Sequence, residues 1–341
     1  TRSKQGPHAP PLRGSLPPGG RILLGSALRK IVPRQRAEAG AAMHNGGTMP
    51  LTVSPPISLA FSSRPRNAGA LFRSLLAARP AQAAPEQHGI AIEATWHGAQ
   101  ADAKRLRQYR EVCGLTNAGF LPPLYLHAMA MPLHMAIMSH PQFPLRLLGL
   151  VHLSNSMQCL RPIGDFETLD MDCQLHGMEA TERGQTFTLH TRLHTGSETV
   201  WTETSTFMAP LPRSGKRAPP DAQPDWGAPI ARWAVAGNAG RRFAGPSGDW
   251  NPIHVSAITA RLFGYPRAIG HGMFSAARCV DLLCRNLPAC APLHIDLRFK
   301  RPLLIPGEVA LHTRQEADST RFVLNVLPHG EPHIEGALRR L

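Results

Sequence analysis

Long apolar runs are missing from this sequence. A membrane-spanning helix needs about twenty predominantly apolar residues, and the longest candidate, residues 124–138, is interrupted by His127, Pro132 and His134. A secretory signal of the usual kind is missing as well. These absences exclude a helical membrane protein, and we expect a soluble, cytoplasmic chain with no membrane span.

Cysteine pairs and local metal-binding motifs are also missing. The six cysteines are scattered, with no C-x-x-C pair, which is typical of reduced, buried thiols in the cytosol. The seventeen histidines include no HExxH and no Cys/His cluster at zinc spacing. We therefore expect no metal, and the sequence offers no site for a flavin or nicotinamide cofactor.

Acidic residues are nearly absent from the first eighty residues. That stretch holds twelve lysines and arginines and one acid, Glu38, in a chain whose formal net charge is +14. Most of the net charge therefore lies there, and the rest of the chain is nearly balanced. A balanced body does not suit a domain that neutralises many phosphates, so we expect no nucleic-acid partner.

The basic segment has three interpretations. It begins with Thr1 and is rich in Pro, Gly, Ala and Arg as far as Met43 and Met49. A translation that starts upstream of the initiator, a disordered extension and an organellar targeting peptide would all have this composition. We predict no fold for residues 1–65.

A pattern that occurs twice organises the rest of the chain. A strand-like run ends at Arg-Pro and is followed by an acidic turn, first at residues 151–160 and again, about 140 residues later, at 293–300. Three further runs follow each of them, at 169–175, 186–194 and 199–207 and then at 309–314, 321–327 and 333–338. Alternating apolar side chains and Gly-containing loops favour antiparallel hairpins.

A helical stretch precedes each set of strands. Residues 273–287 place apolar side chains at three- and four-residue spacing, and Pro288 closes the stretch. The matching stretch, 123–138, contains Pro132, where we expect a kink or break. A helix wrapped by a curled antiparallel sheet buries both elements. We therefore predict a duplicated α+β unit with a boundary near residue 220, and 43% hydrophobic residues suffice for its core.

Residues 245–273 concentrate reactive side chains. Asp249, Asn251 and His254 fall within six residues, and Pro252 can occupy the first turn of a helix. His254 then projects from the start of that helix while Asp249 lies in the preceding loop. This arrangement can bring a carboxylate and an imidazole to one cavity.

The same segment resembles the signature of the MaoC-like hydratases, the (R)-specific enoyl-CoA hydratase group. The likeness is carried by SGDWNPIH at residues 247–254 and by HGM at 271–273, and it is similar too to the dehydratase segment of fungal-type fatty acid synthases. A weaker resemblance extends from roughly residue 71 to 341. It implies a double hotdog fold.

The resemblance also implies a division of the chain. An N-terminal hotdog over residues 66–212 would lack the catalytic motif, because its nearest equivalent, 114–127, has no matching aspartate. Residues 213–228 would be a linker and 229–341 the catalytic hotdog. A second HGM, at 176–178, falls in a strand-like run and is a chance match.

Each residue of the signature has an implied role. Asp249 and His254 would form the catalytic pair, Asn251 would orient His254 or the water, and the backbone N–H of Gly272 would receive the thioester oxygen. A donor aimed at that oxygen stabilises the charge that develops there. Gly270 departs from the family pattern and would add flexibility beside this donor.

A second set of residues is assigned to substrate binding. Gly248, His271 and Met273 belong to the signature, and we expect His271 to buttress the loop and not to transfer a proton in the reaction. Three basic residues on a late strand would meet the phosphates of a pantetheine carrier or form a solvated strand face. They are Arg298, Lys300 and Arg301.

The expected activity is the reversible hydration of a trans-2-enoyl thioester to the (3R)-hydroxyacyl thioester by acid–base catalysis, with CoA as the carrier. The alternatives are a substrate on acyl carrier protein, a non-catalytic acyl-thioester binding module, and thioester hydrolysis on the same fold. A monomer and a homodimer of double hotdogs are both compatible with the sequence.

Overall fold

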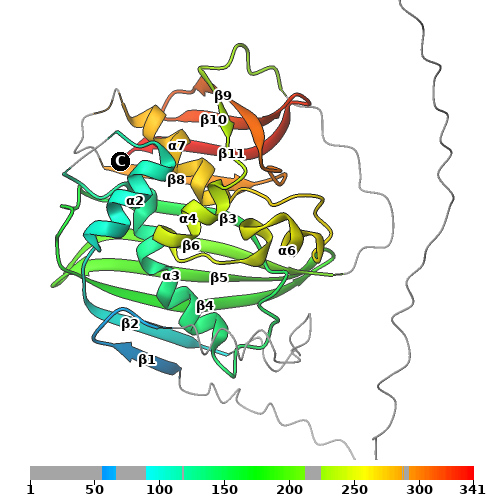
Figure 1. The fold of residues 1–341 in the computed structure, drawn as a ribbon. Helices are drawn as coiled ribbons and strands as arrows, with labels where there is room; N and C mark the ends of the chain where they lie inside the picture. The colour runs from blue at the N-terminus through cyan, green and yellow to red at the C-terminus, as the bar shows by residue number, and fades with distance from the viewer. Residues whose placement is uncertain (1–55, 67–89, 117–118, 212–223, 286, 288–291) are drawn as a thin grey trace, which may run out of the picture. The chain divides into compact units, whose positions relative to one another are not determined.

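A computed structural model describes residues 56–66, 90–116, 119–211, 224–285, 287 and 292–341 (Figure 1). Most of the basic tail, most of the predicted linker and Pro288 lie outside the described residues. Within them, no helix is long and apolar enough to cross a membrane.

The elements follow the repeated order seen in the sequence. The first half comprises β1 (Ile57–Phe61), β2 (Ile92–Ala99), α2 (Ala103–Cys113), α3 (Pro123–Ser139), β3 (Val151–Cys159), β4 (Leu169–Thr181), β5 (Gly184–Thr195) and β6 (Glu198–Pro210). The second half comprises β7 (Ala231–Val235), α4 (Ala239–Ser247), α5 (Pro252–Val255), α6 (Ala257–Arg261), α7 (Gly272–Cys284), β8 (Leu293–Phe299), β9 (Gly307–Gln315), β10 (Thr320–Leu327) and β11 (Glu331–Arg340).

One continuous sheet joins the two halves. Its strand order is β1-β2-β4-β5-β6-β3-β8-β11-β10-β9-β7. The central β3 and β8 are antiparallel and pair from Ser154–Arg298 to Cys159–Leu293. On either side of this pair the strands repeat the same order, so that β2, β4, β5, β6 and β3 correspond to β7, β9, β10, β11 and β8.

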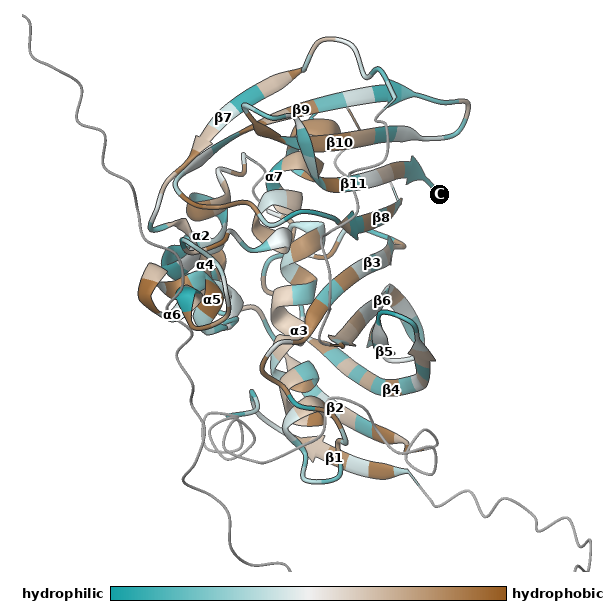
Figure 2. Ribbon diagram, turned by 90° about the vertical axis from the view of Figure 1, so that its right-hand side faces the viewer, coloured by the Kyte–Doolittle hydropathy of each residue, from teal (hydrophilic) through white to brown (hydrophobic). Residues whose placement is uncertain are grey.

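The two central helices fill the middle layer. Figure 2 shows α3 and α7 between the curled sheet on one side and α2, α4 and α6 on the other. The apolar side chains of α3 are almost all buried, with Leu133 and Ile137 fully so. In the outer layer α2 packs on α4, where the rings of Tyr109 and Phe243 are 5.6 Å apart between centroids. Two helices, each wrapped by antiparallel strands, make the double hotdog and confirm the predicted fold class.

Two local predictions need correction. Pro132 does not break its helix, because α3 continues through it from Pro123 to Ser139; burial of this helix under the sheet outweighs the loss of one backbone hydrogen bond. The stretch predicted to have no fold also contains a strand. Residues of β1 pair in parallel with β2, from Ile57–Ile92 to Phe61–Trp96, which extends the sheet at its edge.

Candidate active site

A short helix and its preceding loop position the predicted catalytic pair. The helix α4 ends at Ser247. Gly248 follows it in a left-handed conformation with φ of 83° and caps the helix through a hydrogen bond from its N–H to the carbonyl of Ala244. This turn directs the chain into the loop of Asp249. Helix α5 then begins with Pro252, and the side chain of Asn251 accepts a hydrogen bond from the N–H of Ile253 as its N-cap.

His254 is held by its Nδ1 atom. That nitrogen lies 2.9 Å from the carbonyl oxygen of Ile269. A carbonyl only accepts, so Nδ1 carries the proton and Nε2 keeps its lone pair. The ring stacks on that of His271 at 3.7 Å between centroids, with an interplanar angle of 28°. The lone pair of Nε2 is therefore available to accept a proton.

Asp249 and His271 complete the cluster. Each of Asp249, His254 and His271 offers one ligand atom within 4.8 Å of the other two. The Nε2 of His271 lies 3.1 Å from the backbone oxygen of Asp249 and 3.7 Å from its Oδ2. The N–H of Asn251 donates to Oδ1 of Asp249 at 3.1 Å. Asn251 therefore contacts the Asp249 carboxylate through its backbone N–H and caps α5 with its side chain, and His271 contacts the backbone of the Asp249 loop.

Burial and neighbouring charges set the protonation states. Burial lowers the pKa of His254, and Asp249 and the Ile269 carbonyl only partly offset this effect. Burial likewise lowers the pKa of His271, to about 3. Burial alone would raise the pKa of Asp249, but the imidazoles of His271 and His254 and the N–H of Asn251 outweigh it, and the pKa is lowered. At neutral pH the cluster is thus one carboxylate beside two neutral imidazoles.

Gly272 opens helix α7. As the first residue of the helix its N–H has no acceptor inside the helix. A Cβ at this position would lie 2.4 Å from Cδ1 of Phe299 on β8, so any larger residue would collide with that ring. Gly270, two residues before this donor, is buried, and its N–H donates to the carbonyl of Leu303 at 2.8 Å.

The other residues predicted to bind substrate contact parts of the fold away from the predicted catalytic pair. Met273 is buried in the first turn of α7. Lys300 forms an ion pair with Glu335 at 2.9 Å, Arg301 reaches Glu331 at 3.8 Å, and Arg298 is exposed on β8. Among the described residues, no hydrogen bond or ion pair joins these three basic side chains to Asp249 or His254.

An apolar cavity of about 290 Å³ lies between the two halves. Its walls include Leu121 and Leu124 near the start of α3 and Ala277, Val280 and Cys284 on α7. Asp249 and His254 are not among its lining residues. Val280 is one of the apolar residues that line this cavity, and the lining also includes Arg161 and Asp281.

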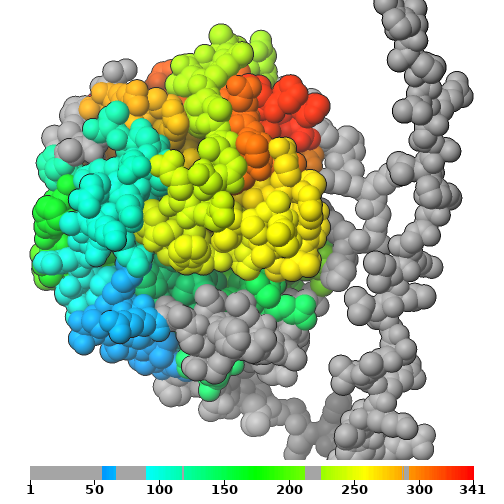
Figure 3. All heavy atoms as spheres, in the orientation of Figure 1, coloured from blue at the N-terminus to red at the C-terminus, as the bar shows by residue number. Residues whose placement is uncertain are grey.

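The surface around the site is formed by the signature segment itself. Residues of α5 and α6, coloured yellow, lie at the molecular surface beside α4 (Figure 3). Trp250, Ile258 and Leu262 are among the most exposed large apolar side chains of the described residues. The loop of Asp249 therefore borders solvent, while His271 behind it is buried.

Comparison with known protein families matches residues 228–327 to the MaoC like domain. The chain carries a MaoC-like dehydratase domain. The match contains all three residues of the Asp249 cluster and the start of α7. It lies within the half of the double hotdog in which the sequence placed the catalytic motif and ends before β11.

Individual relatives extend the likeness beyond the MaoC-like domain. The 3-hydroxyacyl-thioester dehydratase X of Mycobacterium tuberculosis is 28% identical over 243 residues, which span 70% of this chain and 86% of that protein. The (R)-specific enoyl-CoA hydratase of Aeromonas caviae is 35% identical over 69 residues, 20% of this chain and 52% of that protein.

A solved structure shows the same fold. The crystal structure of HtdX of Mycobacterium tuberculosis has a TM-score of 0.65 and 26% identity, and the alignment covers 73% of this chain and all of that one. Dehydratases and hydratases of this kind are hydro-lyases. The chain with its MaoC-like domain is an enzyme of that class.

Sequence reasoning missed several residues that surround the site. Phe299 covers Gly272, and it also lies against His152 of β3 at 4.8 Å between ring centroids. His333 bonds the hydroxyl of Ser275 on α7 at 3.1 Å. These contacts join strands to the central helix, and local sequence patterns carry no sign of them. A second buried cluster, around Glu203, was also missed.

Proposed function

We propose that this protein adds water to the double bond of a trans-2-enoyl thioester and removes it from the (3R)-3-hydroxyacyl thioester. The observation that supports this most directly is the meeting of Asp249 with His254. A carboxylate with a lowered pKa stands beside a neutral imidazole whose Nε2 is free. This pair suits the activation of a water molecule.

In the hydration direction, the Asp249 carboxylate accepts a hydrogen bond from the water and His254 Nε2 takes its proton. The water oxygen forms a bond to the β-carbon, and the electron pair of the double bond moves toward the α-carbon and the thioester carbonyl. The protonated His254 then returns the proton to the α-carbon. Dehydration reverses these steps, and no electron donor or acceptor is required.

Negative charge develops on the thioester oxygen during this reaction. The N–H of Gly272 lies at the start of α7, where the helix dipole also favours negative charge. We propose that it donates to this oxygen. Losing one such donor typically costs about 3 kcal/mol of transition-state stabilisation. Phe299 supports this role because its ring leaves room only for glycine at position 272.

The finer assignments follow the relatives. The names of the relatives, a 3-hydroxyacyl-thioester dehydratase and an (R)-specific enoyl-CoA hydratase, favour the (3R) product and make CoA our proposed carrier. A cytoplasmic location is also proposed. The five described cysteines are free thiols, as is typical of a reducing compartment.

The test is the loss of enoyl-thioester absorbance when the full chain meets crotonyl-CoA and a longer trans-2-enoyl-CoA. Turnover by the parent and near-silence from Asp249→Asn and His254→Ala would support both the reaction and its residues. Equal rates in the parent and the variants would refute the site. If the folded parent acts only on the same acyl groups attached to acyl carrier protein, the carrier is acyl carrier protein and not the proposed CoA.

A further inference from the structure

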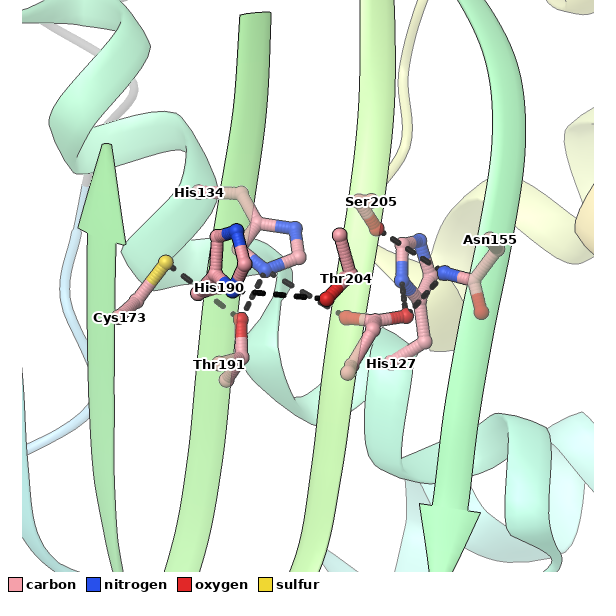
Figure 4. Close-up of polar contacts among 9 residues, drawn as sticks. His127, His134, Asn155, Cys173, His190, Thr191, Thr204 and Ser205 are labelled. Carbon is pink, nitrogen blue, oxygen red and sulfur yellow. Dashed lines mark hydrogen bonds and ion pairs between the residues drawn. The ribbon is translucent and has the colours of Figure 1, made fainter. Parts of the chain in front are cut away.

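A second cluster of ionisable side chains lies inside the first half of the molecule. His127 and His134 on α3 face Glu203 on β6, with Thr191 on the neighbouring strand β5 (Figure 4). The His127 Nδ1 atom is 2.6 Å from Oε1 of Glu203, and the His134 Nε2 atom is 3.7 Å from Oε2. The three side chains are exposed by only 4%, 0% and 0%.

Helix periodicity and sheet register bring these residues together. His127 and His134 are seven residues apart, which is two turns, so they lie on one face of α3. Glu203 is paired with Thr191 across β5 and β6, and its side chain points toward that face. The signal in the sequence was the spacing of the two histidines, but the carboxylate is supplied by a residue almost seventy positions further along.

The carboxylate of Glu203 is not fully satisfied by its neighbours. The Glu203 side chain is fully buried, and its Oε2 atom has no hydrogen-bond partner. Such an atom carries an energetic cost unless something else satisfies it.

We propose that His127, His134 and Glu203 bind a divalent transition-metal ion, with Zn²⁺ as the ion best matched to them. Their ligand atoms lie within 4.8 Å of one another, and two imidazole nitrogens with one carboxylate oxygen form a zinc ligand set. The hydroxyl of Thr191 lies 2.9 Å from His134 Nε2, and the ion would replace this hydrogen bond. This site is independent of the proposed hydration reaction.

The surroundings of the carboxylate resemble the supporting layer of a metal site. The amide of Asn155 donates to Oε1 of Glu203 and also to the hydroxyl of Ser205, the latter at 3.0 Å. Such outer hydrogen bonds orient a ligand before the ion arrives. The bound ion would join α3 to β6 and neutralise the buried charge. The sequence motifs considered above contain metal ligands that are close together in the chain. The ligands proposed here come from α3 and β6, which are far apart in the chain.

The test is a titration of the purified, chelator-treated full chain with Co²⁺, whose visible absorption reports coordination by nitrogen and oxygen, followed by competition with Zn²⁺. We expect one bound ion per chain. Binding should weaken at least 100-fold in Glu203→Gln, which keeps the shape of the side chain, and in His134→Gln. Circular dichroism identifies a variant that does not fold. If one of the two variants is unfolded, Co²⁺ binding by the other variant tests the proposal.

His254→Ala is the matched control, because Asp249, His254 and His271 form the other group of potential ligands among the described residues. Unchanged Co²⁺ binding in His254→Ala, together with loss in Glu203→Gln, supports the site. No binding by the folded parent overturns the proposal. Loss in His254→Ala with retention in Glu203→Gln also overturns it, because the ion would then lie in the catalytic cluster.

Discussion

The two hotdogs of this chain share a strand order but carry their ionisable groups in different places. In the second half, Asp249 and His254 lie on a loop and a four-residue helix at the edge of the fold and are half-buried. In the first half, His127, His134 and Glu203 lie on the central helix and a central strand and are buried. Groups that meet a substrate need access, whereas groups that meet each other or an ion do not.

The connection before the central helix accounts for this difference. In the second half, α5 and α6 stand between α4 and α7 and carry the reactive side chains. In the first half, the connection from Cys113 to Pro123 holds no helix within its described residues. The added segment gives one copy the proposed acid–base pair, while the strand order of the two halves stays the same.

The largest effect should come from the catalytic half. We expect His254→Ala to lower kcat/KM for a trans-2-enoyl-CoA by about 10²- to 10⁴-fold, because the base that accepts the proton of water is lost. His190→Ala on the exposed outer face of β5 should leave the rate within twofold. A comparable loss of kcat/KM in both variants would contradict the assignment of His254, because His190 lies outside the proposed site.

Removing a member of the buried Glu203 cluster should lower the free energy of unfolding. Glu203→Ala leaves His127 and Asn155 without their shared partner, and removing one member of a buried charged network typically costs about 3–5 kcal/mol. Urea unfolding of the chelator-treated protein measures the change. The matched variant is Glu198→Ala, which removes a largely exposed carboxylate and should cost less than about 1 kcal/mol. Similar losses of unfolding free energy in the two variants would contradict the expected difference between the buried and the exposed carboxylate.

Position 272, the first residue of α7, should tolerate no residue larger than glycine. Gly272→Ala places a methyl group against Phe299, and such overpacking costs about 1–3 kcal/mol. Activity should fall with it. Gly164→Ala is the control, because a Cβ added there meets only Oε2 of Glu167, at 4.0 Å, and the free energy of unfolding should change by less than about 1 kcal/mol. A double variant, Gly272→Ala with Phe299→Leu, should recover part of the lost stability.

The smallest effect concerns pH. In the proposed reaction His254 acts in its neutral form, and burial lowers its pKa below the ordinary 6.5. A lowered pKa means that the proton binds only at more acidic pH. The acid limb of kcat/KM should therefore fall below pH 6.5, and the rate should stay constant from there to neutrality. The Asp249 pKa is lowered as well and acts in the same direction. An acid limb above pH 6.5 would contradict this assignment.

The sequence by itself determined the repeat, the two central helices, the eight strands of the meanders and the local geometry of the Asp249 segment. These features depend on neighbours in the chain. Alternation specifies a strand, apolar spacing specifies a helix, and Asn251 followed by Pro252 starts a helix. For the same reason, His254 was expected at a helix start with Asp249 in the loop before it.

Tertiary structure decided what those local elements meet. The stacking of His271 on His254, the cover of Phe299 over Gly272 and the contact of His127 with Glu203 each join different elements. The parallel pairing of β1 is of the same kind. Such contacts depend on how strands are registered and how helices lie across them, and a one-residue shift of register would turn each side chain to the opposite face. Only the folded chain brings these groups together.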